Sequence, residues 1–134
     1  GGNESASSNM PARRYERDLR AMLDHVRQAS PDSSCMLFSP LDQGHKVRGK
    51  IKTVPILLDI VSIQRRVSRE YDCAFWSTFD AMGGENAMAT WRKSRLASGD
   101  LRHATRAGYE LIGNLAYKAF MKGFSDYWTR THEN

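Results

Sequence analysis

Apolar residues between positions 11 and 29 recur with the period of an α-helix. Spacings of four, three, one and three residues place five of them on one stripe: Tyr15, Leu19, Met22, Leu23 and Val26. A stripe of this kind faces a protein core, so the pattern predicts an amphipathic helix that begins at Pro11. The pair Pro31 and Asp32 forces a turn after it, and the small polar residues 1–10 are expected to form a loop.

Two short, unbroken apolar runs at residues 35–38 and 73–76 predict β-strands. Runs without polar alternation are typical of strands buried on both faces, as in a parallel sheet covered by helices. The stretch 41–52 lies between them; it is polar and basic, with glycines at positions 44 and 49, and is expected to be a loop.

Further helices are predicted on either side of the second strand. One begins near Thr53 as N-cap, with Pro55 in its first turn, where the missing N–H costs little. Its buried face comprises Ile56, Leu57, Ile60, Val61 and Val67. Gly83 and Gly84 break the chain before a partly helical segment that contains Met88, Trp91 and Leu96. Thr105 is expected to cap a last helix, whose apolar face comprises Tyr109, Ile112, Ala116, Ala119, Phe120 and Phe124.

Helices alternating with strands predict an α/β fold with parallel strands flanked by helices. A length of 134 residues suits one domain or part of one. Because two strands do not make a stable doubly wound sheet, residues 1–134 are expected to form a single α/β region that is the C-terminal half of a domain. Such a half would expose an apolar sheet edge, which predicts self-association.

The chain carries 20 Lys and Arg against 15 Asp and Glu, a formal charge of +5. A basic run, His45, Lys46, Arg48, Lys50 and Lys52, is either a solvated loop or attracts a polyanion such as a cell-wall polymer, membrane headgroups or nucleic acid. No aromatic residues accompany the run, so no specific nucleic-acid partner is predicted. No apolar run reaches the ~18–20 residues that span a bilayer. The chain opens at Gly1 without a methionine, so the lack of a signal peptide carries no information on targeting.

Cys35 and Cys73 are too few for a disulfide scaffold and lack the spacing of metal ligands. Each lies in an apolar run, where a buried free thiol is the expected state, although a bridge is conceivable if the strands are neighbours. No cluster of His, Cys, Asp or Glu suggests a metal, and no cofactor is predicted.

The pair Asp100 and His103 carries the candidate chemistry. A histidine that acts as general base needs an acceptor on its other ring nitrogen, and an aspartate three residues earlier on a turn can supply one. Alone, this spacing fits a surface aspartate beside a helix-capping histidine better than a catalytic pair.

The stretch from Asp100 to Tyr109 resembles the terminal block of the SGNH (GDSL-type) hydrolases, in which an Asp-x-x-His pair precedes a threonine and a Gly-Tyr pair. The start, Gly1-Gly2-Asn3-Glu4, resembles the family's Gly-x-Asn-Asp/Glu block about a hundred residues earlier. The segments at Ser39-Pro40 and 79–85 are similar to the family's bacterial carbohydrate and peptidoglycan O-acetylesterases. The resemblance implies the C-terminal part of a flavodoxin-like three-layer domain, with Gly83 and Gly84 as a wall of its site.

By this resemblance Asn3 donates its side-chain amide to the oxyanion, His103 moves the nucleophile's proton, and Asp100 orients His103. The family's serine lies in a Gly-Asp-Ser block that this chain lacks. Six serines were considered as replacements. Ser39, Ser77 and Ser94 lack the sharp strand-to-helix turn that exposes a nucleophile, and Ser5, Ser7 and Ser8 lie on a polar stretch that is expected to be mobile.

The sequence therefore predicts part of a serine esterase that acts on an acyl ester, such as an O-acetylated sugar or peptidoglycan, and that is nearly inert alone. Two alternatives stay open. One is a non-catalytic α/β module for binding or assembly, and the other is a polyanion-binding domain built around residues 45–52. The resemblance favours a periplasmic or exported protein over a cytoplasmic one.

Overall fold

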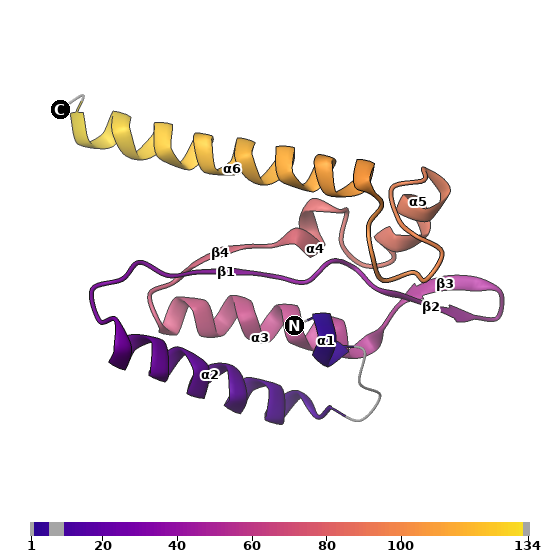
Figure 1. The fold of residues 1–134 in the computed structure, drawn as a ribbon, viewed down its shortest axis with the longest axis horizontal. Coiled ribbons are helices and arrows are strands. Elements are labelled where there is room, and N and C mark those ends of the chain that lie inside the picture. The colour runs from indigo at the N-terminus through magenta and orange to yellow at the C-terminus, as the bar shows by residue number, and fades with distance from the viewer. Residues whose placement is uncertain (1, 6–9, 133–134) are drawn as a thin grey trace.

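The computed structural model describes residues 2–5 and 10–132 (Figure 1). The described helices are α1 (Gly2–Ser5), α2 (Ala12–Ala29), α3 (Pro55–Glu70), α4 (Thr78–Ala81), α5 (Ala87–Lys93) and α6 (Arg106–His132). The described strands are β1 (Met36–Phe38), β2 (Gly44–Val47), β3 (Lys50–Thr53) and β4 (Ala74–Trp76).

The strands β1 and β4 form a parallel pair at the centre of the molecule, with Leu37 opposite Phe75. Helix α6 lies on one side of this pair, while α3 lies on the other side with α2 packed beneath it (Figure 1). This layering confirms the predicted α/β class with parallel strands flanked by helices.

Helices α2 and α3 bury the apolar stripes that the periodicity predicts, with two differences. Tyr15, Leu19 and Leu23 pack against α3, but Met22 and Val26 at the flank of the stripe are exposed. The N-cap of α3 is Val54 rather than Thr53. Thr53 instead ends β3, where its hydroxyl donates to the buried carboxylate of Asp42 at 2.8 Å.

The strands are less buried than the unbroken apolar runs suggest. Met36 and Phe38 are exposed, so the prediction of burial on both faces is wrong for β1. Met36 and Phe38 project from the same face of the pair, where Phe38 meets Phe120 of α6, and this helix covers the face only in part.

Cys35 and Cys73 are joined by a disulfide, which corrects the expectation of free thiols. The parallel register places the two cysteines opposite each other, with their Cα atoms 4.8 Å apart. The bridge closes a loop with a sequence separation of 38 residues and clamps the N-terminal ends of β1 and β4.

Residues 41–52, predicted as a loop, contain an antiparallel β-hairpin of β2 and β3. Arg48 and Gly49 form its two-residue turn with φ values of 47° and 77°. Positive φ at both positions is the geometry of the tight hairpin turns that match strand twist. The alternation of residues 44–53 was hidden because basic side chains occupy both faces.

Two terminal elements also differ from expectation. Gly2–Ser5 is a helical turn rather than a loop. On α6, the predicted apolar face is largely exposed, with Phe120 and Phe124 at 40% and 57% exposure. Phe120 meets Phe38 edge-on, with ring centroids 5.9 Å apart, so the exposed parts of α6 and β1 form one apolar surface.

Candidate active site

Asp100 and His103 lie on the loop between α5 and α6, and their side chains meet. The Nδ1 atom of His103 is 2.6 Å from Oδ2 of Asp100. The other carboxylate oxygen, Oδ1, accepts hydrogen bonds from the Ser98 hydroxyl and from the backbone N–H groups of Arg102 and His103, at 2.9 and 3.1 Å.

These donors hold the pKa of Asp100 well below its ordinary range, and the Ser98 hydroxyl is the largest cause, followed by His103. Asp100 is therefore an anion at neutral pH. An ionised carboxylate only accepts hydrogen bonds, so Nδ1 of a neutral His103 must carry the proton. That tautomer leaves the lone pair on Nε2, which is the atom a general base uses.

The frame of this loop is fixed by its two helices. Thr105 caps α6 through its hydroxyl, which accepts from the N–H of Gly108 at 3.3 Å and donates to the carbonyl of Arg95 at 2.9 Å. Gly108 is buried where α6 meets the carbonyl of Leu96, and a Cβ there would lie 2.0 Å from that oxygen. A glycine is therefore required for the helix to approach the loop this closely.

The middle of the loop is fixed by the hairpin. Leu101 is buried with a left-handed φ of 61°, and its carbonyl accepts from the N–H of Gly44 at 2.8 Å. Ser98 closes the loop from the other side by donating its N–H to the carbonyl of His103 at 2.8 Å. The Asp100–His103 turn is thus held at both its flanks and its centre.

The sequence-predicted residues Asn3 and His103 line the same surface cavity, although they are about a hundred residues apart in the chain. The cavity has a volume of about 320 Å³ and its remaining lining residues are Pro40, Leu41, Gln43, Arg102 and Tyr109. His103 is exposed at the rim, its side chain 69% accessible. The cavity is therefore lined by the Asn3 amide, by the imidazole of His103 and by apolar side chains.

Gly83 and Gly84, which resemblance implied as a wall of the site, do not line this cavity. Both have positive φ and form the turn between α4 and α5. Asn86, which follows them with a φ of 66°, accepts from the N–H of Thr53 at 3.2 Å and so joins this turn to the hairpin. The glycines therefore lie in a turn that adjoins the hairpin rather than in the wall of the cavity.

The serines have structural roles where they are described. Ser5 is 4% exposed, and its hydroxyl donates to Gln43 at 2.8 Å, so the expectation that it is mobile is wrong. Ser39 is buried and accepts from the N–H of Phe79 at 2.9 Å. Ser94 ends α5. Ser7 and Ser8 lie outside the described residues.

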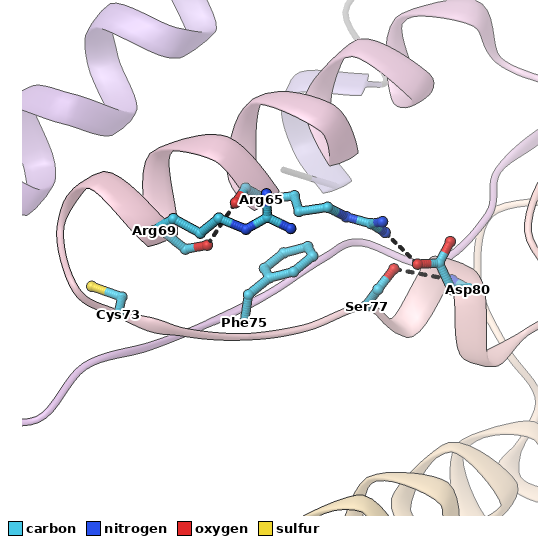
Figure 2. Close-up of a pocket in the computed structure, with 7 residues that line it drawn as sticks. Arg65, Arg69, Cys73, Phe75, Ser77 and Asp80 are labelled. Carbon is cyan, nitrogen blue, oxygen red and sulfur yellow. Dashed lines mark hydrogen bonds and ion pairs between the residues drawn. The ribbon is translucent and has the colours of Figure 1, made fainter.

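Ser77 lies in a second hollow of about 440 Å³ on the other side of β4, lined by Arg65, Ser68, Arg69, Cys73, Phe75, Ser77 and Asp80 (Figure 2). Its hydroxyl caps α4 by accepting from the N–H of Asp80 at 3.1 Å, and Asp80 is paired with Arg65. No histidine lines this hollow. Within residues 2–5 and 10–132, no serine hydroxyl contacts His103.

Sequence reasoning missed Ser98, Arg102 and Gln43. The spacing Ser-x-Asp-x-x-His offered a signal for Ser98, because serine and aspartate two residues apart often share a turn. Arg102 stands next to the predicted base and lines its cavity. Gln43 reaches the cavity only because the hairpin folds back on the loop, which no local pattern reveals.

In the part of the chain that the structure describes, no three His, Cys, Asp or Glu side chains are grouped so that they could hold a metal ion. The same residues include no helix with the length and apolar character needed to cross a membrane.

Comparison with known proteins shows which solved structures share this fold. No protein-family profile and no curated protein matches the chain. Among solved structures it is similar to a peptidoglycan O-acetylesterase, with a TM-score of 0.83 and 22% identity, covering 91% of this chain and 35% of that one. It is also similar to the esterase domain of the ORF1 protein from the zebrafish ZfL2-1 retrotransposon, with a TM-score of 0.62 and 20% identity, covering 91% of this chain and 65% of that one.

The likeness establishes the fold: the described chain shares the α/β arrangement of these two esterase structures, consistent with the fold that its motifs predict. The chain spans about a third of the length of the first of these proteins and about two thirds of the second.

Proposed function

We propose that this chain is the part of an SGNH-type serine esterase that carries the general base and an oxyanion donor. The observation that carries the proposal is the Asp100–His103 contact at 2.6 Å on the rim of a cavity that Asn3 also lines. Two esterases among the structures similar to this chain support the same class.

The proposed mechanism follows from the tautomer of His103. Nε2 takes the proton of a serine hydroxyl as its oxygen attacks the ester carbonyl, while Asp100 stabilises the imidazolium through Nδ1–H. The side-chain amide of Asn3 donates to the oxyanion that forms, a contact typically worth ~3–4 kcal/mol in the transition state. His103 then returns the proton to the leaving alkoxide, and the same steps with water release the acid.

The serine of this mechanism is proposed to come from a segment outside residues 1–134. Ser5 and Ser39 are buried, Ser77 caps a helix, and no hydroxyl of a described serine contacts His103. The match to only 35% of the length of the similar peptidoglycan O-acetylesterase supports a larger functional unit.

For the substrate, we propose an O-acetylated carbohydrate, with peptidoglycan as one such polymer. The similar peptidoglycan O-acetylesterase supports this assignment. The cavity volume of about 320 Å³ suits a small acyl group and part of one sugar ring rather than a long acyl chain.

The alternative of a non-catalytic module is favoured by one observation: among the described residues, no serine hydroxyl contacts the imidazole of His103. In a module without catalysis, Asp100 and His103 would only stabilise the loop before α6. The two functions differ in whether any ester is cleaved.

We also propose a periplasmic or exported location. The Cys35–Cys73 disulfide supports it, because disulfides persist in oxidising compartments and are rare in the cytosol of mesophiles. Thiol titration of the protein purified from its own cell, unfolded without reductant, is expected to detect no free thiol; two free thiols would contradict this location.

The function is tested by combining the chain with the segment that supplies the serine and following acetate release from p-nitrophenyl acetate and from O-acetylated peptidoglycan. The proposal expects release from both substrates and faster cleavage of acetyl than of butyryl esters. Hydrolysis of neither acetyl ester, by a mixture shown to form a complex, would favour the non-catalytic module.

A further inference from the structure

The basic run of residues 44–53 forms a projecting hairpin whose charge is not compensated. Lys46, Arg48, Lys50 and Lys52 are all exposed, and no acidic residue lies in either strand. In the hairpin register His45 faces Lys52 and Val47 faces Lys50, so cations line the strands without an acidic partner opposite. Among the described residues, none of these four cations makes an ion pair.

The first residues of this hairpin contact the candidate active site. The N–H of Gly44 donates to the carbonyl of Leu101, between Asp100 and His103 in the chain, at 2.8 Å. The preceding residue, Gln43, lines the cavity together with His103. The residues at which the hairpin begins therefore lie beside the cavity, so a ligand bound along the hairpin ends next to it.

Further cations lie next to the hairpin, on α5 and on the loop between α5 and α6. Helix α5 packs against β3, and the segment 92–102 contributes four exposed cations, Arg92, Lys93, Arg95 and Arg102. Against these eight cations the two segments contain one acid, Asp100, so they carry a formal charge of +7. The whole chain has a formal charge of +5, so the residues outside these two segments carry −2. The positive charge is therefore concentrated on the hairpin and on the segment 92–102.

Resting on the proposed esterase function, we infer that the β2–β3 hairpin and Arg102 form a docking surface for an anionic polysaccharide that carries the ester. The polymer's acidic groups bind the hairpin cations, and Arg102 receives an acidic group of the residue next to the ester. Concentrated positive charge with no paired acids raises the local concentration of such a substrate at the cavity.

The surface fits a polysaccharide better than a membrane or a nucleic acid. Interfacial membrane binding needs large apolar side chains beside the cations, and the hairpin exposes only Val47 of that kind. Single-stranded nucleic acid binds on aromatic platforms, and residues 44–53 contain no aromatic ring other than His45. A flexible acidic polymer needs neither feature.

The test measures binding of fluorescein-labelled polygalacturonate to the intact chain by anisotropy at several salt concentrations, with neutral dextran as the control probe. The hairpin variant replaces Lys46, Arg48, Lys50 and Lys52 by Gln. The control variant replaces the exposed residues Arg13, Arg14, Arg69 and Lys118 by Gln, which removes the same charge elsewhere.

The expected result is a loss of at least about tenfold in affinity for the hairpin variant, with a shallower salt dependence, and of less than about twofold for the control. A third variant with Lys46, Lys50 and Lys52 replaced by Arg keeps the charge and is expected to bind as the wild type does. Equal loss in the hairpin and control variants would overturn the proposal, as would loss in the arginine variant or no binding by the wild type.

Two further measurements separate the alternatives. The first compares polygalacturonate with anionic phospholipid vesicles and with poly(dT). If either of these bound more tightly than polygalacturonate through the same cations, the choice of a polysaccharide would be overturned. Polygalacturonate is expected to shift the imidazole NMR signals of His103 and not those of His25 on α2, and an unmoved His103 would overturn the link to the cavity. These binding results do not depend on catalysis, so inactivity toward p-nitrophenyl acetate would contradict the proposed function alone.

Discussion

At the scale of single residues, the loop before α6 holds an aspartate whose two oxygens have different tasks. Oδ2 meets Nδ1 of His103, whereas Oδ1 collects the Ser98 hydroxyl and two backbone N–H groups. The donors on Oδ1 keep Asp100 ionised and fix its direction, so Oδ2 is left to orient the imidazole. Ser98 therefore acts as a positioning residue for the pair.

Replacing Ser98 by Ala is expected to raise the pKa of Asp100 toward its ordinary value, because the largest stabilising contact of the carboxylate is lost. The carboxyl ¹³C shift of Asp100, followed against pH by NMR, measures this change. Ser94→Ala is the matched control, since Ser94 is exposed at the end of α5 and has no contact with Asp100. Identical titration of Asp100 in the two variants would show that Ser98 does not govern the carboxylate.

Gly108 and Gly113 both lie on α6 and provide a paired test of its docking. Gly108→Ala places a Cβ against the Leu96 carbonyl and is expected to destabilise the fold by about 1–3 kcal/mol. Gly113 has no atom within 4 Å of an added Cβ, so Gly113→Ala is expected to stabilise by about 0.5–1 kcal/mol through helix propensity. Urea unfolding measures both, and a change of the same sign in both would refute the close approach at Gly108.

At the scale of elements, α2 and α3 are joined by an ion network as well as by their apolar faces. Glu16 on α2 accepts from Arg66 on α3 at 2.7 Å and from Arg20 on its own helix at 2.9 Å. Arg20 in turn reaches Glu70 on α3 at 2.6 Å. Hydrogen bonds from Arg66 and then Arg20 lower the pKa of Glu16 from 4.5 to about 2.

This lowered pKa predicts how stability depends on pH. A carboxylate with a depressed folded-state pKa stabilises the protein above its unfolded pKa, and that contribution is lost as pH falls. Glu16→Gln is therefore expected to flatten the fall in stability between about pH 4.5 and pH 2. The control is Glu110→Gln, because Glu110 pairs with Arg106 along α6 and links no second helix. Thermal unfolding across this pH range measures the effect, and an unchanged pH profile in Glu16→Gln would contradict it.

The main elements were predictable from the sequence because helical periodicity and short apolar runs are local signals. Tyr15, Leu19 and Leu23 marked α2, and residues 35–38 and 73–76 marked the parallel strands. The hairpin was not predictable, because basic side chains lie on both of its faces and its anchor on Leu101 is a tertiary contact. The Asp100–His103 pair was readable from its spacing together with the motif that follows it, whereas Gln43 and Arg102 became part of the site only through the fold.

At the scale of the whole molecule, β1 and α6 present a broad apolar surface that no described residue covers. Its exposed members include Met36, Phe38, Tyr117, Phe120, Met121 and Phe124. Contiguous apolar surface of this kind usually marks an interaction site or an aggregation hazard. In the proposed function, the serine-bearing segment packs here, and in its absence copies of the chain are expected to associate.

Light scattering is expected to show a mass that rises with the concentration of the chain. Phe120→Glu combined with Phe124→Glu should shift the protein to monomer, because charges would be buried in the contact. Leu58→Glu is the control, since Leu58 is 39% exposed on α3 in the opposite layer. A monomer at every concentration would contradict the association.

The central claim is that His103 is the base of an esterase whose serine comes from another segment. The most direct measurement is the rate of p-nitrophenyl acetate hydrolysis by the chain combined with that segment, comparing wild type, His103→Ala and the distant control His25→Ala. We predict a loss of at least about a thousandfold in kcat for His103→Ala and wild-type rates for His25→Ala. Hydrolysis that survives unchanged in His103→Ala would contradict the assignment.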